Sequence, residues 1–164
     1  MQLLNLCLFL LSFGLAWCAA ASAQVTRTWL MFVVPGVAAH EMAHYLVAFL
    51  TFGRPQPISL WPRREGNDWV MGSVSFCPNF FNGGLVALAP LYVLPPVAWF
   101  CWQSHMDAGP IGALALGYLA AVILYAAWPS RTDWVVAIRY PGLLFILCFA
   151  AISIGQDPTI LRTL

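Results

Sequence analysis

Two histidines and a glutamate stand close together in the pattern H-E-x-x-H, as His40, Glu41 and His44. Residues four apart share one face of a helix, so the two imidazoles can bind the same zinc ion. Glu41 lies beside them and can serve as the general base that takes a proton from a zinc-activated water. The spacing therefore predicts a helical zinc site with hydrolytic chemistry.

The motif lies inside an apolar segment, residues 29–52, that is long enough to cross a membrane. Burying an ionised Glu near the middle of a bilayer costs at least a few kcal/mol. Structural zinc returns about 10–16 kcal/mol in small peptides, so a bound metal can offset that cost. The competing interpretation is a pair of hydrogen-bonded intramembrane histidines with a structural carboxylate.

A catalytic zinc needs a third protein ligand and an open position. Four of the remaining acids lie in a predicted hairpin tip, a short polar connection or the C-terminal tail: Glu65, Asp68, Asp107 and Asp157. Asp133 alone stands between two apolar segments, beside a proline-disrupted turn. Its carboxylate can reach the metal from a second element, or it can cap a helix that starts at Trp134. The sequence favours the ligand.

The composition predicts an integral membrane protein. Of the 164 residues, 62% are hydrophobic and 8% are charged, whereas a soluble domain carries roughly 25% charged residues. A net charge of +1 argues against nucleic acid as a partner. The five cysteines are odd in number and form no C-x-x-C, which favours packing residues over disulfides or a thiolate zinc site. His105, in a polar connection, is expected to be solvated rather than a ligand.

Five apolar segments follow one another along the chain, at residues 3–23, 29–52, 83–102, 109–128 and 134–155. They predict a single membrane domain over residues 1–164, all-α, with about five transmembrane helices. The first segment can also be a cleaved signal peptide, but no positive charge precedes it, which favours a retained helix. Pro35 and Gly36 precede the motif by one turn and indicate either a kink that opens room at the metal or simple packing.

One long polar stretch, residues 53–82, follows the second segment. Strand-like composition at 58–61 and 69–76, with turn residues at 62–68, predicts a small β-hairpin insertion. Three arginines in this stretch place it in the cytoplasm by the positive-inside rule, with the N-terminus on the same side and the C-terminus outside. An exposed hairpin edge can bind an unwound substrate by strand addition, or the hairpin can only cover the site. Candidate walls of a water channel to the site are Arg54, Asn79 and Asn82.

Together these features resemble the site-2 protease family of intramembrane zinc metalloproteases. H-E-x-x-H lies in an early membrane helix, a hairpin-like insertion follows, residues 87–91 are similar to a small-residue Gly-Pro segment of the family, and residues 129–133 stand in the place of its Asn-Pro…Asp-Gly motif. The resemblance implies zinc ligands at His40, His44 and Asp133, with Glu41 as catalytic base, in a catalytic core over residues 29–139. The chain departs from the pattern at Ala89 and Trp128, where the family has Gly and Asn, and it lacks the Gly after the Asp and a PDZ-like domain.

The expected function is therefore an intramembrane zinc metallopeptidase, with one catalytic Zn²⁺, that cleaves a membrane protein in or near a transmembrane segment. The protein is expected to cross the bilayer several times and to lie in a bacterial inner membrane. A non-catalytic membrane scaffold or partner-binding protein that retains the fold is the alternative. Zinc transport is disfavoured, because it needs a relay of polar sites across the bilayer and this chain has one cluster. The substrate and the oligomeric state are left open.

Overall fold

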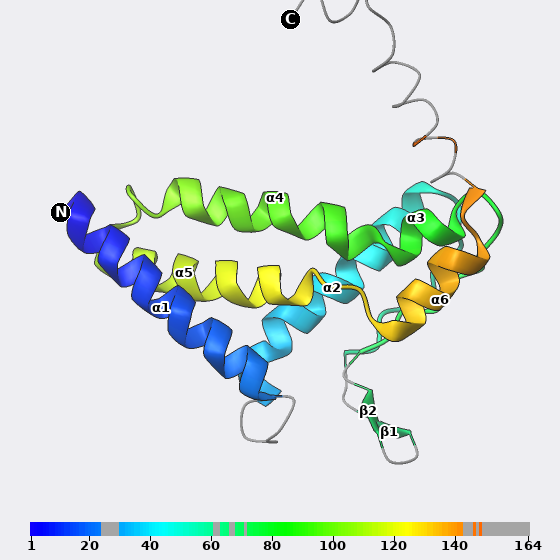
Figure 1. The fold of residues 1–164 in the computed structure, drawn as a ribbon, viewed down its shortest axis with the longest axis horizontal. Coiled ribbons are helices and arrows are strands. Elements are labelled where there is room, and N and C mark those ends of the chain that lie inside the picture. Colours follow the sequence, from blue (N-terminus) through cyan, green and yellow to red (C-terminus); the bar gives the residue numbers. More distant parts are fainter. Residues whose placement is uncertain are drawn as a thin grey trace, which may run out of the picture.

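A computed structural model describes residues 1–23, 30–60, 63–65, 68–70, 72–142, 146 and 148. These residues form a mainly helical protein (Figure 1). The helices are α1 (Gln2–Ala23), α2 (Leu30–Leu50), α3 (Gly83–Ala87), α4 (Ala89–Ser104), α5 (Gly109–Ala126) and α6 (Arg131–Arg139). The two strands are β1 (Arg63–Glu65) and β2 (Asp68–Val70).

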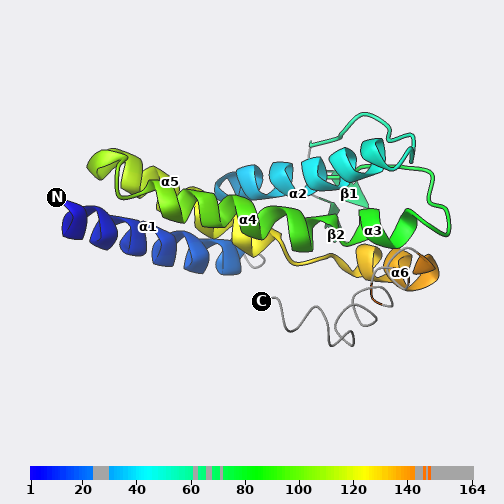
Figure 2. The ribbon, with the colours of Figure 1, turned by 90° about the horizontal axis from the view of Figure 1, so that it is seen from above.

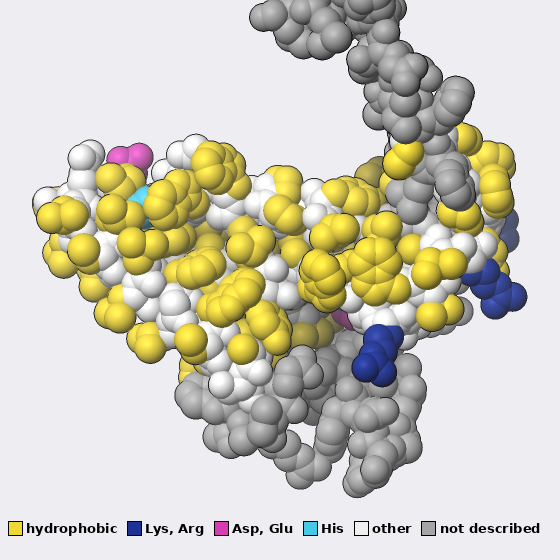
Figure 3. All heavy atoms as spheres, in the orientation of Figure 1, with side chains coloured by type: hydrophobic (Ala, Val, Ile, Leu, Met, Phe, Trp, Pro, Cys, Tyr) yellow, Lys and Arg dark blue, Asp and Glu magenta, His cyan; other side chains and the backbone are white. Residues whose placement is uncertain are grey.

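Three of the described helices contain stretches that are long and apolar enough to span a membrane: Gln2–Ser22, Phe32–Leu50 and Gly109–Ala126. Large apolar side chains on these helices are exposed, including Leu15, Phe49 and Ile111, as expected where the surroundings are lipid rather than water. On the face shown in Figure 3, apolar side chains dominate, and the arginines gather toward the end that holds α3 and α6.

The predicted count of five spans is not supported by the described residues. The third predicted segment is divided at Leu88 into α3 and α4, and the 16 residues of α4 fall short of the roughly 20 that a span needs. The fifth is interrupted as well, because α6 begins at Arg131 and ends at Arg139, two residues before Pro141. Most of the remainder of that segment, and residues 24–29 after α1, lie outside the described residues.

Helix α5 is the centre of the bundle and packs against α1, α2 and α4 (Figures 1 and 2). Small residues allow this close packing. A Cβ on Gly36 of α2 would lie 2.5 Å from the carbonyl oxygen of Val122 and 3.2 Å from the Cβ of Ala126 on α5. Of the two interpretations of Pro35 and Gly36, this contact favours packing: α2 continues as one helix through Pro35.

The insertion between α2 and α3 differs from the predicted hairpin in where its strands lie. The antiparallel pair is β1 with β2, in a register that joins Arg63 to Val70, so the strands occupy much of what the sequence predicts as the turn. Between 58–61 and 72–76, an isolated bridge joins Ser59 to Ser73 in place of a regular ladder. The predicted strand positions are therefore wrong. The regular pairing lies instead among the polar residues next to the turn, and Pro55 and Pro57, which have no N–H to donate, precede the predicted strand at 58–61.

Two backbone hydrogen bonds join the residues after α6 to α3 and to the segment before it. The N–H of Gly84 donates to the carbonyl of Tyr140 at 2.8 Å, and the N–H of Gly142 donates to the carbonyl of Phe80 at 3.0 Å. A Cβ on Gly83 would meet the ring of Tyr140, so glycine permits this approach. The contact fixes where α6 lies relative to α3, which in turn packs against α2.

Candidate metal centre

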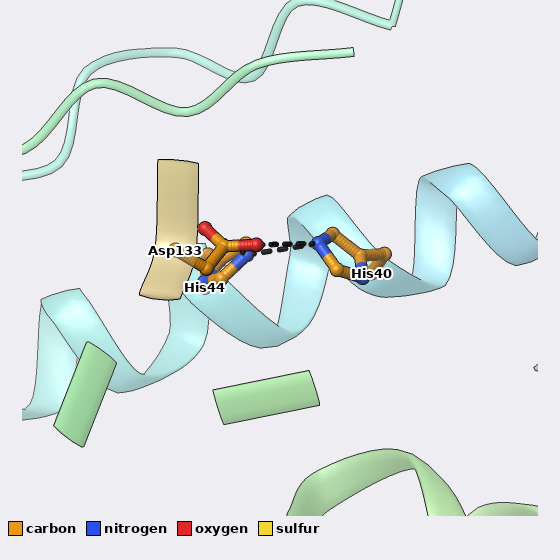
Figure 4. Close-up of side chains that lie close together, drawn as sticks. All are labelled: His40, His44 and Asp133. Carbon is orange, nitrogen blue, oxygen red and sulfur yellow. Dashed lines mark hydrogen bonds and ion pairs between the residues drawn. The ribbon is translucent and has the colours of Figure 1, made fainter. Parts of the chain in front are cut away.

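The side chains of His40, His44 and Asp133 converge on one point (Figure 4). The histidines lie one turn apart on α2, and their Nε2 atoms are 3.0 Å from each other. The carboxylate of Asp133 comes from α6. One of its oxygens is 3.5 Å from Nε2 of His40, and the other is 3.4 Å from Nε2 of His44. Residues far apart in sequence thus bring three potential ligand atoms together.

These separations fit a tetrahedral zinc site. Zinc binds imidazole nitrogen and carboxylate oxygen at about 2.0–2.2 Å, so neighbouring ligand atoms in a tetrahedron lie roughly 3.3–3.5 Å apart. The observed spacings of 3.0, 3.4 and 3.5 Å lie within a few tenths of an ångström of that edge. Among the described residues, this is the one group of three or more His, Cys, Asp or Glu side chains with such spacing.

The hydrogen bonds made by the Nδ1 atoms, on the side of each ring away from the convergence point, fix the tautomer of both histidines. Nδ1 of His40 lies 2.7 Å from the carbonyl oxygen of Ala126 on α5, and Nδ1 of His44 lies 2.8 Å from the carbonyl oxygen of Val86 on α3. A carbonyl only accepts, so each Nδ1 carries the proton and donates. Each Nε2 therefore directs a lone pair at the convergence point, and metal-ligating histidines are oriented in this way.

Asp133 is oriented by the helix that carries it. The N–H of Ser130 donates to Oδ2 of Asp133 at 2.7 Å, while the hydroxyl of Ser130 accepts from the N–H of Asp133 at 3.2 Å. This reciprocal capping box begins α6 and also aims the carboxylate at α2. Partial burial works to raise the pKa of Asp133, but in the metal-free protein the imidazoles of His40 and His44, when they are protonated, and the bond from Ser130 outweigh it and hold that pKa well below its usual range.

The convergence point therefore needs a positive charge. Two Nε2 lone pairs and a carboxylate are all acceptors, and acceptors at 3.0–3.5 Å repel one another unless a cation lies among them. A proton on an imidazole satisfies part of this requirement, and a divalent metal satisfies all of it. The side chains of His40 and Asp133 remain 13% and 16% exposed, so the point is partly accessible from outside the protein.

Glu41 lies next to the two histidines on α2 and is 9% exposed. The backbone N–H of Val74, in the insertion, hydrogen-bonds to its carboxylate. Gly72 covers it closely, since a Cβ there would lie 2.9 Å from Cγ of Glu41. The segment after β2 thus screens this carboxylate and leaves it beside the group of His40, His44 and Asp133.

The alternative role predicted for Asp133, the N-cap of a helix that starts at Trp134, is wrong, because Ser130 is the N-cap and Asp133 is the third residue of α6. Its backbone and one carboxylate oxygen complete the capping box, while both oxygens face the imidazoles. The helix starts three residues earlier than predicted, at Arg131 rather than Trp134, so Asp133 lies in its first turn and not before it. The pattern S-x-x-D at 130–133 is itself a capping-box signature and is the sequence signal for the role of Ser130.

The candidate channel walls have structural contacts in this fold. Oδ1 of Asn79 accepts from the N–H groups of Phe81 and Asn82, and the side chain of Asn82 bonds the backbone of Asn79 and Thr51. Both amides therefore fasten the end of the insertion to the end of α2. Arg54 is exposed and adopts a positive φ of 49° in the turn after α2.

The prediction that His105 is solvated is wrong. The residue is 2% exposed, its ring packs against Phe9 and Trp102, and its Nδ1 bonds the carbonyl of Trp102. The polar connection between α4 and α5 folds back onto α1, which a reading of local polarity does not reveal.

Comparison of the chain with models of protein families, with characterised proteins and with solved structures found no match.

Proposed function

We propose that this protein is a membrane-embedded zinc peptidase, similar to the site-2 proteases, with His40, His44 and Asp133 as ligands and Glu41 as catalytic base. The observation that carries the proposal is the convergence of three acceptors with both imidazoles fixed as the Nδ1–H tautomer. That arrangement suits a divalent cation, and three protein ligands would leave one tetrahedral position for water or substrate, as in catalytic zinc sites.

Side chains and backbone groups around the site have separate roles in the proposed hydrolysis. When bound, zinc supplies a Lewis acid that polarises the scissile carbonyl and makes water a better nucleophile. Glu41 takes the proton of the attacking water and passes it to the leaving amine. The N–H of Val74 holds the Glu41 carboxylate in place, and the burial around it keeps bulk water away. The Ser130 cap keeps Asp133 directed at the imidazoles.

The substrate class follows from where the site lies. The ligands come from α2, whose stretch Phe32–Leu50 is long and apolar enough to span a membrane. A peptide bond in or beside a membrane segment can reach such a site once its helix unwinds. The insertion passes next to Glu41 at Gly72, so it can contact an unwound segment that reaches the site.

A comparison of variants tests the proposal. Wild type, Glu41→Gln and His44→Ala are purified in detergent, their zinc content is measured, and cleavage of membrane-segment peptides is followed by mass spectrometry. We expect one zinc per chain in wild type and in Glu41→Gln, cleavage by wild type alone, and loss of both zinc and cleavage in His44→Ala. Zinc in wild type with no cleavage of any membrane peptide would favour a non-catalytic scaffold, and absence of zinc from wild type would refute the metal site.

A further inference from the structure

The two carbonyls that accept from the histidines are free to do so because a proline follows each of them. In a continuous helix, a carbonyl accepts from the N–H four residues along the chain. For Val86 that residue is Pro90, which has no N–H. The carbonyl of Val86 is approached by the N–H of Leu88 and accepts from Nδ1 of His44 at 2.8 Å in place of the missing N–H.

The second carbonyl is freed in a related way. Helix α5 ends at Ala126, just before Pro129, and a proline disfavours helical backbone at the residue before it. The residue four positions after Ala126 is Ser130, whose N–H donates to the carboxylate of Asp133. The carbonyl of Ala126 is therefore left to accept from Nδ1 of His40, at 2.7 Å.

We propose that Pro90 and Pro129 are positioning residues for the metal centre: each frees the backbone carbonyl that fixes the tautomer and the ring orientation of one histidine. The expected effect of these prolines on metal binding rests on the proposed function. Pro129 has a double effect, because ending α5 there releases the Ala126 carbonyl toward His40 and the Ser130 N–H toward Asp133 at the same time. Neither proline touches the metal or a substrate, so neither is a catalytic residue.

The burial of the contacts supports this role. Val86 and Pro90 are among the most completely buried side chains among the described residues, and His44 is 5% exposed. Water cannot easily replace a lost carbonyl partner at this depth, so the orientation of the His44 ring depends on the Val86 carbonyl. The outer-shell partners of metal-bound histidines typically change metal affinity by about 10- to 100-fold when removed.

The substitution Pro90→Ala tests the inference, because an alanine N–H can bond the Val86 carbonyl and compete with His44. The matched control is Pro96→Ala, which removes an exposed proline from the same helix, four residues beyond the carbonyl of Tyr92. We expect the Kd for zinc to rise about 10- to 100-fold in Pro90→Ala and to stay at the wild-type value in Pro96→Ala. Thermal unfolding of Pro90→Ala shows whether the variant still folds, because the substitution removes part of a fully buried side chain in the first turn of α4 and is expected to lower the midpoint.

Nitrogen-15 NMR of the histidine rings gives a second readout that needs no zinc. The wild type should show a protected Nδ1–H on His40 and on His44. Pro90→Ala should lose the His44 signal selectively, and Pro129→Ala should lose that of His40. If Pro90→Ala does not fold, Pro129→Ala carries the same test at the other ring. Unchanged Nδ1–H signals in a folded variant would overturn the inference, whereas absence of zinc from wild type with these signals altered as expected would overturn the proposed function alone.

Discussion

Replacing Asp133 by Asn separates the two jobs that this side chain performs. The amide oxygen of Asn can still accept from the N–H of Ser130, so the capping box and the start of α6 are preserved. The negative charge that faces His40 and His44 is lost. Ser130→Ala makes the opposite change, because it removes the hydroxyl that accepts from Asp133 and keeps the carboxylate.

The size of each effect follows from the site. Zinc sites with four protein ligands bind with about 10–16 kcal/mol, or about 2.5–4 kcal/mol for each ligand. Loss of the Asp133 carboxylate should therefore raise the Kd for zinc by roughly 100- to 1,000-fold. Loss of the Ser130 cap should cost about 0.5–2 kcal/mol of stability and raise the Kd by about 10-fold, since the carboxylate then rotates more freely.

Competition with a chromophoric zinc chelator in detergent measures both values. Asp107→Asn, a change to an exposed acid between α4 and α5, is the control for loss of charge and should bind zinc like wild type. If Asp133→Asn keeps wild-type affinity while Ser130→Ala unfolds more readily, Asp133 serves only in the capping box and is not a third ligand.

Three further predictions follow from single contacts. Gly36→Val should push α2 away from Val122 of α5, which should lower the free energy of unfolding by about 1–3 kcal/mol and weaken zinc binding. Thermal unfolding and a zinc titration that both match wild type would contradict this. Gly72→Val should displace Glu41 and abolish peptide cleavage with zinc content intact, whereas Gly14→Val, with no atoms within 4 Å of its Cβ position, should do neither. The low pKa of Asp133 means that this group stabilises the metal-free fold above pH about 4 and loses that contribution as pH falls below it. The midpoint temperature of thermal unfolding should thus fall more between pH 5 and pH 3 in wild type than in Asp133→Asn. Equal falls in the two proteins would be inconsistent with the contact between Asp133 and the imidazoles.

The apolar helices and the group of His40, His44 and Asp133 could be predicted from the sequence. On any helix, H-E-x-x-H places its two histidines on the same face, because residues i and i+4 lie one above the other. The scarcity of acids outside polar loops then left Asp133 as the third candidate, and the fold brings it to the histidines. Composition alone identified the apolar segments that became α1, α2 and α5.

The parts that failed depend on contacts between distant segments. The strand positions in the insertion were wrong because a short antiparallel pair forms at the polar tip, where side-chain propensity is a weak guide. His105 was misjudged because its burial comes from α1, about a hundred residues away in sequence. The acceptor carbonyls of Val86 and Ala126 carry no side-chain signal at all, although the prolines that free them are visible in the sequence.

X-ray absorption at the zinc edge of the purified protein tests the central claim most directly. We expect one zinc per chain with nitrogen and oxygen neighbours at about 2.0–2.2 Å and an outer-shell pattern from two imidazoles. A spectrum with sulfur neighbours at about 2.3 Å, or the absence of bound zinc from protein purified with the metal present, would contradict it.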